Sequence, residues 1–307
     1  MAPLRFSFVA RESIHFADGK SSNILRGAFG TIFRRIACLP RCLEANACEW
    51  RANCPYARMF EPAATAPGPS GLADWPRPFV FRAMHLDGRT FAVGAPFHFD
   101  LNLFDTESTA IAYLVLTFAQ LARDGLGPGR RKVELATVAR LNEQGAPGGL
   151  IYENGVIKAQ DSATLALDLN PAGERVSRLR VTFLTPTELK SGQQIAARPE
   201  FGVLAARVRD RISTLRELYG GGPLEIDFRE FGERAASVKM TRCEIGSVDV
   251  RRRSSRTGQV HSIGGFVGEA DYEGDLGEFV PYLRVAKWTG VGRQTVWGKG
   301  EIALDCW

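Results

Sequence analysis

The order of strand-like and helix-like segments repeats along the 307 residues, and this repeat constrains the fold more than any single motif does. Each half of the chain reads as a strand, a helix, two strands, a second helix and a last strand. The first strand illustrates the pattern, because Leu4, Phe6 and Phe8 alternate with Arg5 and Ser7. Such alternation is typical of a strand that buries one face.

A βαββαβ order is that of the ferredoxin-like unit. The sequence therefore predicts an α+β protein with two tandem ferredoxin-like, or RRM-like, domains. These are residues 1–145, with a Cys-rich insertion at 38–60, and residues 146–307, with a glycine-rich loop at 288–300. In the first domain we expect strands at 4–12, 79–84, 96–104 and 131–141, and helices at 21–37 and 108–124. In the second we expect a hairpin at 150–169, strands at 178–184, 242–251, 260–270 and 301–304, and helices at 200–219, 228–238 and 276–287.

The first predicted helix carries two glycines on its polar side. Ser21 or Ser22 is expected to cap the helix, and apolar residues recur every four positions as a single stripe. The opposite side carries Gly27 and Gly30, and a glycine in a helix interior costs roughly 1 kcal/mol relative to alanine. We therefore expect protein backbone or a ligand to lie close to this face. Arg34 also lies on this face, and Arg26 lies at its edge.

The charge of the chain suits a polyanionic partner. The net charge is +5, the pI is about 9.0, and only seven of the 39 basic residues are lysine. Arginine binds phosphate with two hydrogen bonds and stacks on bases, so this bias favours nucleic acid. A GC-rich genome is the alternative explanation, since it raises arginine as well as alanine, glycine and proline.

The chain shows no run of about 18 apolar residues, so no membrane span is expected. Its first residues alternate as in a strand and have no signal-peptide core. We therefore expect a cytoplasmic protein that has no membrane partner.

The segment Trp288–Ile302 reads W-T-G-V-G-R-Q-T-V-W-G-K-G-E-I and holds four glycines. Glycine lets a backbone approach a phosphate closely, and the interleaved polar residues add donors. The residue order is neither that of a nucleotide P-loop nor that of a dinucleotide fingerprint. The segment is either a set of ordinary turns or a grip for an anionic polymer. The residues assigned to the grip are Gly290, Gly292, Arg293, Gln294, Thr295, Gly298, Lys299 and Gly300.

The insertion contains four cysteines, Cys38, Cys42, Cys48 and Cys54. Four thiolates within reach of one point would hold a structural zinc ion, and a short loop without a packed core gains stability from such a metal. The spacing lacks C-x-x-C knuckles, so reduced and buried thiols are the alternative. Disulfides are disfavoured in the expected cytoplasmic location.

Six short motifs are distributed over nearly the whole chain. They are L-R-G-A-F-G at Leu25–Gly30, the cysteine-and-tyrosine segment up to Tyr56, T-P-T-E-L-K at Thr185–Lys190, R-I-S-T-L-R-E-L-Y-G at Arg211–Gly220, G-G-F-V-G at Gly264–Gly268, and the glycine-rich segment near the C-terminus. Together they resemble the CRISPR-associated repeat-processing endoribonucleases, a branch of the RAMP superfamily. The last motif resembles the C-terminal glycine-rich loop of that superfamily. The resemblance implies two tandem ferredoxin-like domains.

The resemblance also implies a reaction, the cleavage of CRISPR precursor RNA within each repeat without a catalytic metal. The 2′-hydroxyl next to the scissile phosphate attacks in line and leaves a 2′,3′-cyclic phosphate, so the substrate must be RNA. This chemistry needs a base, an acid and cations that stabilise the charge on phosphorus. The implied partners are repeat RNA and other subunits of a CRISPR effector complex.

The acid or base is where the chain departs from the family pattern. Members with a catalytic histidine carry it after the first helix, but residues 38–54 contain none. His15, just before that helix, is either the acid or base or an ordinary loop residue. Some members use arginine instead, and Arg26, Arg34 and Arg293 are the candidates here. We predict that His15 and Arg26 lie near the scissile phosphate.

An arginine cluster is expected at the tip of a hairpin in the second domain: Arg251, Arg252, Arg253 and Arg256. Such a tip suits the phosphates of an A-form repeat stem, which proteins recognise chiefly by shape and backbone. A solvated run of charge is the alternative.

Two other functions remain open. A catalytically inactive RNA-binding subunit of a CRISPR ribonucleoprotein effector complex would have the same folds and glycine-rich loop, and the missing histidine favours it. A zinc-dependent DNA-binding regulator would use the cysteines, but no basic recognition helix follows them.

Overall fold

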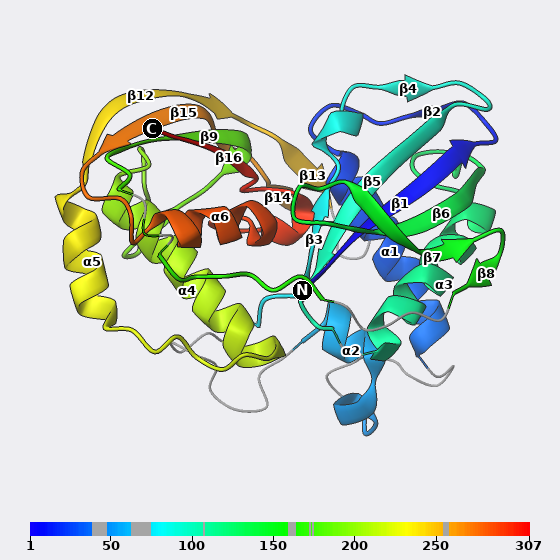
Figure 1. The fold of residues 1–307 in the computed structure, drawn as a ribbon. Helices are drawn as coiled ribbons and strands as arrows, with labels where there is room; N and C mark the ends of the chain where they lie inside the picture. The colour runs from blue at the N-terminus through cyan, green and yellow to red at the C-terminus, as the bar shows by residue number, and fades with distance from the viewer. Residues whose placement is uncertain are drawn as a thin grey trace. The chain divides into compact units, whose positions relative to one another are not determined.

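A computed structural model of the protein describes residues 1–38, 48–62, 75–106, 108–158, 164–171, 173, 175–253 and 258–307. The chain forms two compact units, Met1–Ala166 and Leu167–Trp307 (Figure 1). Each unit is a ferredoxin-like α+β fold, which confirms the predicted fold class. The Cys-rich insertion is visible only in part, because residues 39–47 lie outside the described residues.

The first unit is built on an antiparallel sheet with the strand order β3-β5-β1-β6-β7-β8. Leaving out the β7–β8 hairpin, the strands stand in the order second, third, first and fourth along the chain, as in a ferredoxin-like unit. The strands are β1 (Ala2–Ala10), β3 (Phe79–Arg82), β5 (Pro96–Leu103), β6 (Val133–Leu141), β7 (Pro147–Glu153) and β8 (Val156–Ile157).

Two long helices, α1 (Ser21–Ala37) and α3 (Ser108–Asp124), cover one face of this sheet. The core between them is aromatic, because the Phe118 ring lies 4.6 Å from that of Phe6 and 5.4 Å from that of Phe29. The shorter elements are β2 (Ile14–His15), which pairs with β4 (Thr90–Phe91), helix α2 (Pro55–Phe60), and the 3-10 turns η1 (Arg51–Asn53) and η3 (Met84–Leu86).

The N-terminus of α1 is capped by a residue remote in sequence. Lys20 occupies the cap position and makes no side-chain cap bond. Asp87 instead accepts hydrogen bonds from the backbone N–H of Ser21 at 2.9 Å and from its hydroxyl at 2.5 Å. The expectation that Ser21 or Ser22 caps the helix is therefore wrong: Ser21 donates at the helix end, and a carboxylate satisfies its free N–H.

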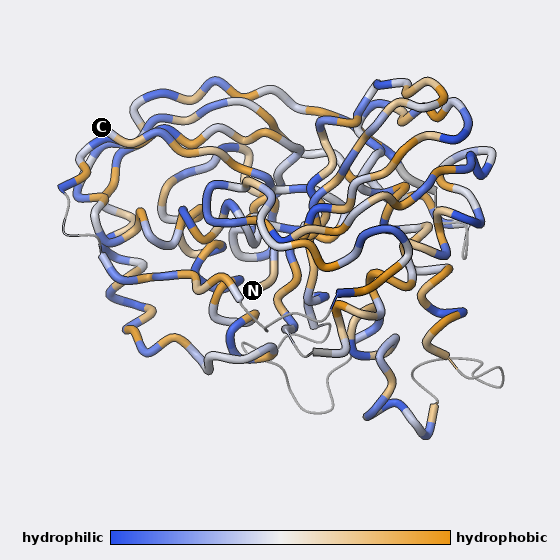
Figure 2. Tube along the Cα trace, turned by 45° about the vertical axis from the view of Figure 1, so that its right-hand side comes forward, coloured by the Kyte–Doolittle hydropathy of each residue, from blue (hydrophilic) through white to orange (hydrophobic). Residues whose placement is uncertain are grey.

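The second unit repeats the topology with the strand order β12-β15-β9-β16. Along β9, Leu179, Val181 and Phe183 are buried and alternate with exposed or half-buried residues. Figure 2 shows the same alternation of hydropathy along the strands. The main elements are β9 (Arg178–Thr187), α4 (Phe201–Tyr219), β12 (Lys239–Val248), β15 (Gly265–Glu273), α6 (Val280–Thr289) and β16 (Ile302–Cys306).

The second unit also has smaller additions. Helix α5 (Phe228–Ser237) is capped by the Asp227 carboxylate. Two short hairpins are β10 (Lys190–Ser191) with β11 (Gln194–Ile195), and β13 (Arg251–Arg253) with β14 (Val260–Ser262). A 3-10 turn, η4 (Thr295–Trp297), lies within the glycine-rich loop.

The boundary between the units falls after Ala166 and not after residue 145. The reason is the hairpin that the sequence analysis placed in the second domain: β7 pairs with β6 and β8 with β7, so both strands extend the sheet of the first unit. The predicted strand 260–270 is two strands, β14 and β15. Among the described residues, no helix is long and apolar enough to cross a bilayer.

Candidate nucleic-acid interface

The glycine-rich loop, residues 288–300, begins at the C-terminal end of α6. Arg211 of α4 donates from Nε to the Thr289 carbonyl oxygen at 2.8 Å, which satisfies one of the last carbonyls of the helix. The N–H of Gly290 still bonds to the Ala286 carbonyl oxygen at 2.8 Å, and Gly290 then turns the chain with φ 72°. The start of the loop is therefore fixed by α4 and α6 together.

The loop then packs onto the end of β9 and the residues after it. The N–H of Arg293 donates to the Glu188 carbonyl oxygen at 3.1 Å, and the N–H of Gly300 donates to that of Pro186 at 3.2 Å. A Cβ on Gly292 would lie 2.2 Å from the Glu188 carbonyl oxygen. The approach is backbone to backbone, so these positions require glycine whether or not a ligand binds.

Lys299 lies inside this packing. It is 2% exposed, and its ammonium donates to Glu188 Oε2 at 2.5 Å and to Gln294 Oε1 at 3.0 Å. Burial lowers the pKa of Lys299, while the Glu188 carboxylate acts in the opposite direction. The lysine that the sequence analysis assigned to RNA therefore holds the loop to the segment after β9.

The residue that the loop presents to solvent is Arg293. Its side chain is 52% exposed, and its guanidinium lies 3.8 Å from the second oxygen of Glu188. Gln294 follows in a left-handed conformation with φ 61°. Thr295, Gly298 and Gly300 are buried, so of the eight residues assigned to the grip Arg293 is the one with an exposed charge.

Three of the sequence motifs meet at this loop. The T-P-T-E-L-K segment supplies Glu188, the R-I-S-T-L-R-E-L-Y-G segment supplies Arg211, and both bind the glycine-rich segment. In the sequence they are separate motifs, because the contacts between them are long-range and leave no local pattern.

The two residues assigned to catalysis lie in the first unit, where they contact different elements. His15 is exposed in β2, and its Nδ1 shares a hydrogen bond of 2.9 Å with the Thr90 hydroxyl of β4. Arg26 is 9% exposed, and its guanidinium lies 4.8 Å above the centre of the Phe60 ring in α2. Each side chain thus has a separate local environment.

The glycine-bearing face of α1 is only partly used for packing. A Cβ on Gly30 would lie 2.2 Å from the Phe60 ring, so this glycine admits α2 of the Cys-rich insertion. Gly27 is exposed and has nothing within 4 Å of its Cβ position. The face expected to meet backbone or a ligand is therefore occupied at Gly30 and open at Gly27. Arg34 is half-buried near its end.

The cysteines give no support to a zinc site. Cys38, Cys48 and Cys54 are half-buried, and the described residues hold no group of three side chains that could bind a metal ion. Cys42 lies outside the described residues.

The arginine hairpin is β13–β14, with Arg252 opposite His261. Arg251 is exposed and lies 3.2 Å from the Asp249 carboxylate. Arg256 lies outside the described residues, as does the rest of the segment 254–257.

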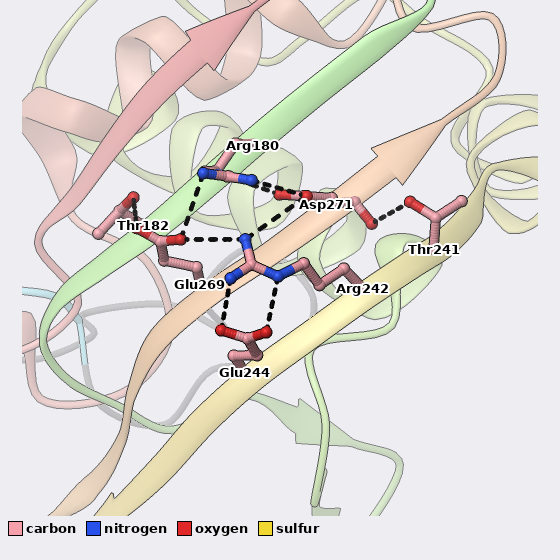
Figure 3. Close-up of polar contacts among 7 residues, drawn as sticks. All are labelled: Arg180, Thr182, Thr241, Arg242, Glu244, Glu269 and Asp271. Atoms are coloured by element: carbon pink, nitrogen blue, oxygen red, sulfur yellow. Dashed lines mark hydrogen bonds and ion pairs between the residues drawn. The ribbon is translucent and has the colours of Figure 1, made fainter.

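The sheet of the second unit carries an ionic network that the sequence analysis missed (Figure 3). Arg180 donates to both oxygens of Asp271 at 2.7 and 2.9 Å, and Arg242 donates to Glu244 at 2.8 Å. Glu269 lies 3.5 Å from each arginine. The cross-strand register pairs these residues, so their arginine charge is neutralised on the sheet.

Two family models match the chain. AF_1859_N, described as an N-terminal domain, matches residues 1–164. CRISPR-associated endoribonuclease Cas6 matches residues 181–302, the part that contains the glycine-rich loop and both of its anchors. Among curated proteins, none matches the chain in sequence.

Solved structures resemble the chain over its whole length. The product complex of Cas6 (TTHB231), from Thermus thermophilus, has a TM-score of 0.57 at 16% identity and covers 99% of this chain and 98% of its own. The product complex of Cas6 (TTHA0078) has a TM-score of 0.54 at 18% identity, with 99% and 100% covered. A partial Cas6-RT-Cas1–Cas2 complex has a TM-score of 0.55 at 11% identity, with 100% of this chain and 46% of that chain covered. At these identities the likeness establishes the fold.

Proposed function

We propose that this chain is a CRISPR repeat-processing endoribonuclease of the RAMP type, which cleaves CRISPR precursor RNA within its repeats. The observation that carries the proposal is the match of residues 181–302 to the Cas6 endoribonuclease model, because this region holds the anchored glycine-rich loop. The expected product is a mature guide RNA, made in the cytoplasm.

The proposed chemistry is transesterification. The ribose 2′-hydroxyl attacks the adjacent phosphate, the bond to the 5′-oxygen of the next nucleotide breaks, and the products end in a 2′,3′-cyclic phosphate and a 5′-hydroxyl. The attacking hydroxyl loses a proton and the leaving oxygen gains one, so no metal is required if the chain supplies the acid, the base and positive charge.

We assign the RNA backbone to the exposed edge of the glycine-rich loop, at Arg293 and Gln294. An arginine fork matches a phosphate with two parallel hydrogen bonds. Arg293 lies near Glu188 at 3.8 Å, a distance at which a phosphate can compete for the guanidinium. The glycines and Thr295 contribute the backbone shape of the loop, and Lys299 contributes its attachment.

His15 and Arg26 are the proposed catalytic residues of the first unit, with Arg34 as a further RNA contact. An exposed imidazole can take or give a proton near neutral pH. His15→Ala is expected to lower kcat on repeat RNA by about 10²- to 10⁴-fold. His85→Ala is the matched control, since it removes another exposed histidine.

Arg26→Ala is expected to lower kcat, but it also removes the guanidinium that covers Phe60. Arg26→Lys and a melting temperature separate the two effects, because lysine keeps the charge and loses the fork. If both His15→Ala and Arg26→Ala cleave as fast as the wild-type protein, these two assignments are removed.

We assign the stem of the repeat to the arginine hairpin, through Arg251, Arg252, Arg253 and Arg256. Replacing these arginines with glutamine should flatten the plot of log affinity against log salt by about one unit for each phosphate that the hairpin no longer binds. An unchanged slope would mean that the hairpin is a solvated run of charge.

A catalytically inactive subunit of a CRISPR effector complex is the second candidate. The observation that favours it is the sequence itself, which has no histidine in residues 38–54, directly after the first helix. The complex of Cas6 with RT, Cas1 and Cas2 is an example of a similar fold within a larger assembly. Incubating the protein with a labelled repeat in EDTA separates the two: discrete cyclic-phosphate ends mean an enzyme, and an intact but shifted RNA means a binding subunit.

A further inference from the structure

The first unit has a loop at the same place in the fold as the glycine-rich loop of the second unit. It joins α3 to β6, as the glycine-rich loop joins α6 to β16. This α3–β6 loop, residues 125–132, reads G-L-G-P-G-R-R-K. It too combines three glycines with a cluster of cations, and neither its position nor its charge has a role in the function proposed above.

The α3–β6 loop is closed as a tight turn. The N–H of Arg130 donates to the Gly127 carbonyl oxygen at 3.1 Å, with Pro128 and Gly129 between them. Gly129 has φ 78°, so proline and glycine occupy the central positions that a type II turn favours. The backbone of Arg131 then pairs with that of Leu126 through two hydrogen bonds of 2.8 and 3.0 Å, so the cations follow the turn on a defined backbone.

The two loops share unusual backbone features. A Cβ on Gly125 would lie 2.1 Å from the Arg130 carbonyl oxygen, and one on Gly300 would lie 1.9 Å from that of Val291. Three described residues other than glycine have a left-handed φ: one lies in the β7–β8 turn, and the other two are Arg130 (48°) and Gln294 (61°). Each loop thus holds one side chain at a backbone position that glycine would adopt more readily.

The cations of the α3–β6 loop are exposed. Within the described part of the chain, neither Arg130 nor Arg131 is paired with a carboxylate. The Lys132 ammonium donates to the carbonyl oxygens of Arg123 and Asp124, at 2.6 and 3.4 Å, and so closes the end of α3. The two guanidinium groups, on residues adjacent in sequence, are therefore exposed charges that no described carboxylate pairs with.

The surroundings of the loop include a neighbour of the proposed catalytic residue His15. A Cβ on Gly127 would lie 3.8 Å from Ile14 Cδ1 and 3.9 Å from Ile24 Cγ2. Ile14 precedes His15 in β2, and Ile24 is one turn before Gly27 in α1. The turn therefore lies beside the elements that carry His15 and the open helix face.

We propose that the α3–β6 loop is a second binding site for the phosphate backbone of RNA, with Arg130 and Arg131 as the contacts. The inference rests on the proposed function, since it assigns a further grip on the same substrate. Two exposed arginines that no described carboxylate pairs with leave both forks available to the phosphates of a polyanion. Arg130 has a left-handed backbone conformation, in which glycine would be more stable. An arginine at such a position is consistent with a side chain that serves binding and not folding.

The test is the salt dependence of repeat-RNA binding by an Arg130→Gln and Arg131→Gln double variant. Releasing two phosphates from the protein should flatten the slope of log affinity against log salt by about 1.4 to 1.8. The control is Arg229→Gln with Arg234→Gln, which removes two exposed arginines that are paired with Glu233 and Glu278, and it should leave the slope near the wild-type value.

The variant Arg130→Gly distinguishes an RNA-binding role of Arg130 from a purely structural one. Glycine relieves the left-handed backbone, so the melting temperature should rise while RNA affinity falls. If the double variant keeps both the wild-type slope and the wild-type affinity, this site is overturned and the proposed function stands. If the wild-type protein binds no repeat RNA, the proposed function fails and this site fails with it.

Discussion

Lys299 of the glycine-rich loop is buried against Glu188, whereas Arg130 and Arg131 of the α3–β6 loop are exposed. Both loops are held by a glutamate that follows the first strand of their unit. In the second unit Glu188 accepts from the lysine ammonium, while in the first unit Glu12 accepts from the backbone N–H of Lys132 at 2.7 Å. The same topology therefore places positive charge in two ways. In the second unit a buried lysine fixes the loop, and in the first unit two exposed arginines present positive charge to solvent.

The largest effects are expected from the glycines that both loops share. Alanine at Gly300 or Gly125 meets a carbonyl oxygen and a left-handed φ, which together cost about 2–6 kcal/mol. Gly145→Ala is the control, since its φ is 77° but nothing lies within 4 Å of its Cβ position. Urea unfolding measures the differences. If all three alanine variants lose the same unfolding free energy, the close contact with a carbonyl oxygen makes no contribution at Gly300 and Gly125.

The next largest effect is a difference in stability between variants of the two loop lysines, Lys299 and Lys132. Lys299→Met removes the buried ammonium from the half-buried Glu188 carboxylate, which keeps only Arg293 at 3.8 Å, and should cost about 3–5 kcal/mol of unfolding free energy. Lys132→Met removes exposed bonds to the end of a helix and should cost at most about 1 kcal/mol. A Glu188→Gln and Lys299→Met double variant should recover part of the first loss. Similar costs for the two lysines would contradict the contrast between the loops.

Smaller effects of opposite sign are expected from the two glycines of α1, the helix beside the α3–β6 loop. Gly30→Ala places a methyl group against Phe60 and should cost about 1–3 kcal/mol. Gly27→Ala meets open space and should stabilise the protein by about 1 kcal/mol, because alanine is the better helix former. Melting temperatures with and without repeat RNA test both. A Gly27→Ala protein that is more stable yet binds RNA less tightly would place RNA near this face.

The smallest effect is a pH dependence confined to the first unit. Burial, together with Arg5 and His85, lowers the pKa of His98 below 6.5, while Asp100 opposes the shift. The folded state therefore binds fewer protons than the unfolded chain in this range, so stability falls as the pH drops below about 6.5. Melting temperatures between pH 5 and 7.5 should show a loss on acidification that His98→Gln reduces. An identical profile for the variant would assign the loss to other groups.

Periodic segments were predictable because their signal is local. Helix α3 has the predicted bounds, Ser108–Asp124, since its apolar residues recur at the helical period and Gly125 ends it. The cap of α1 was not predictable, because its carboxylate lies 66 residues away from Ser21. Lys299 was placed on the surface for a similar reason: its partner Glu188 is 111 residues away, and a charged side chain suggests exposure until that partner is known.

The α3–β6 loop shows a different limit. The predicted helix 108–124 ends just before Gly125, as observed, but the glycines and arginines that follow look like ordinary turn residues in the sequence. They resemble residues 288–300 in their place in the fold: each loop joins the second helix of its unit to the fourth strand of the ferredoxin-like sheet. That correspondence depends on the sheet topology, which the residue types do not specify. In the same way, the pairing of Arg180 with Asp271 depends on strand register, which residue types alone do not specify.

The account is tested most directly by one comparison, with EDTA present throughout: cleavage of an all-ribose repeat RNA and of the same RNA with a single 2′-deoxy nucleotide immediately 5′ to the mapped cut. We predict that both RNAs bind with similar affinity, that the first is cut to a 2′,3′-cyclic phosphate end, and that the second stays intact. Cleavage of the deoxy-substituted RNA at that position, or no cleavage of the all-ribose repeat, would contradict the account.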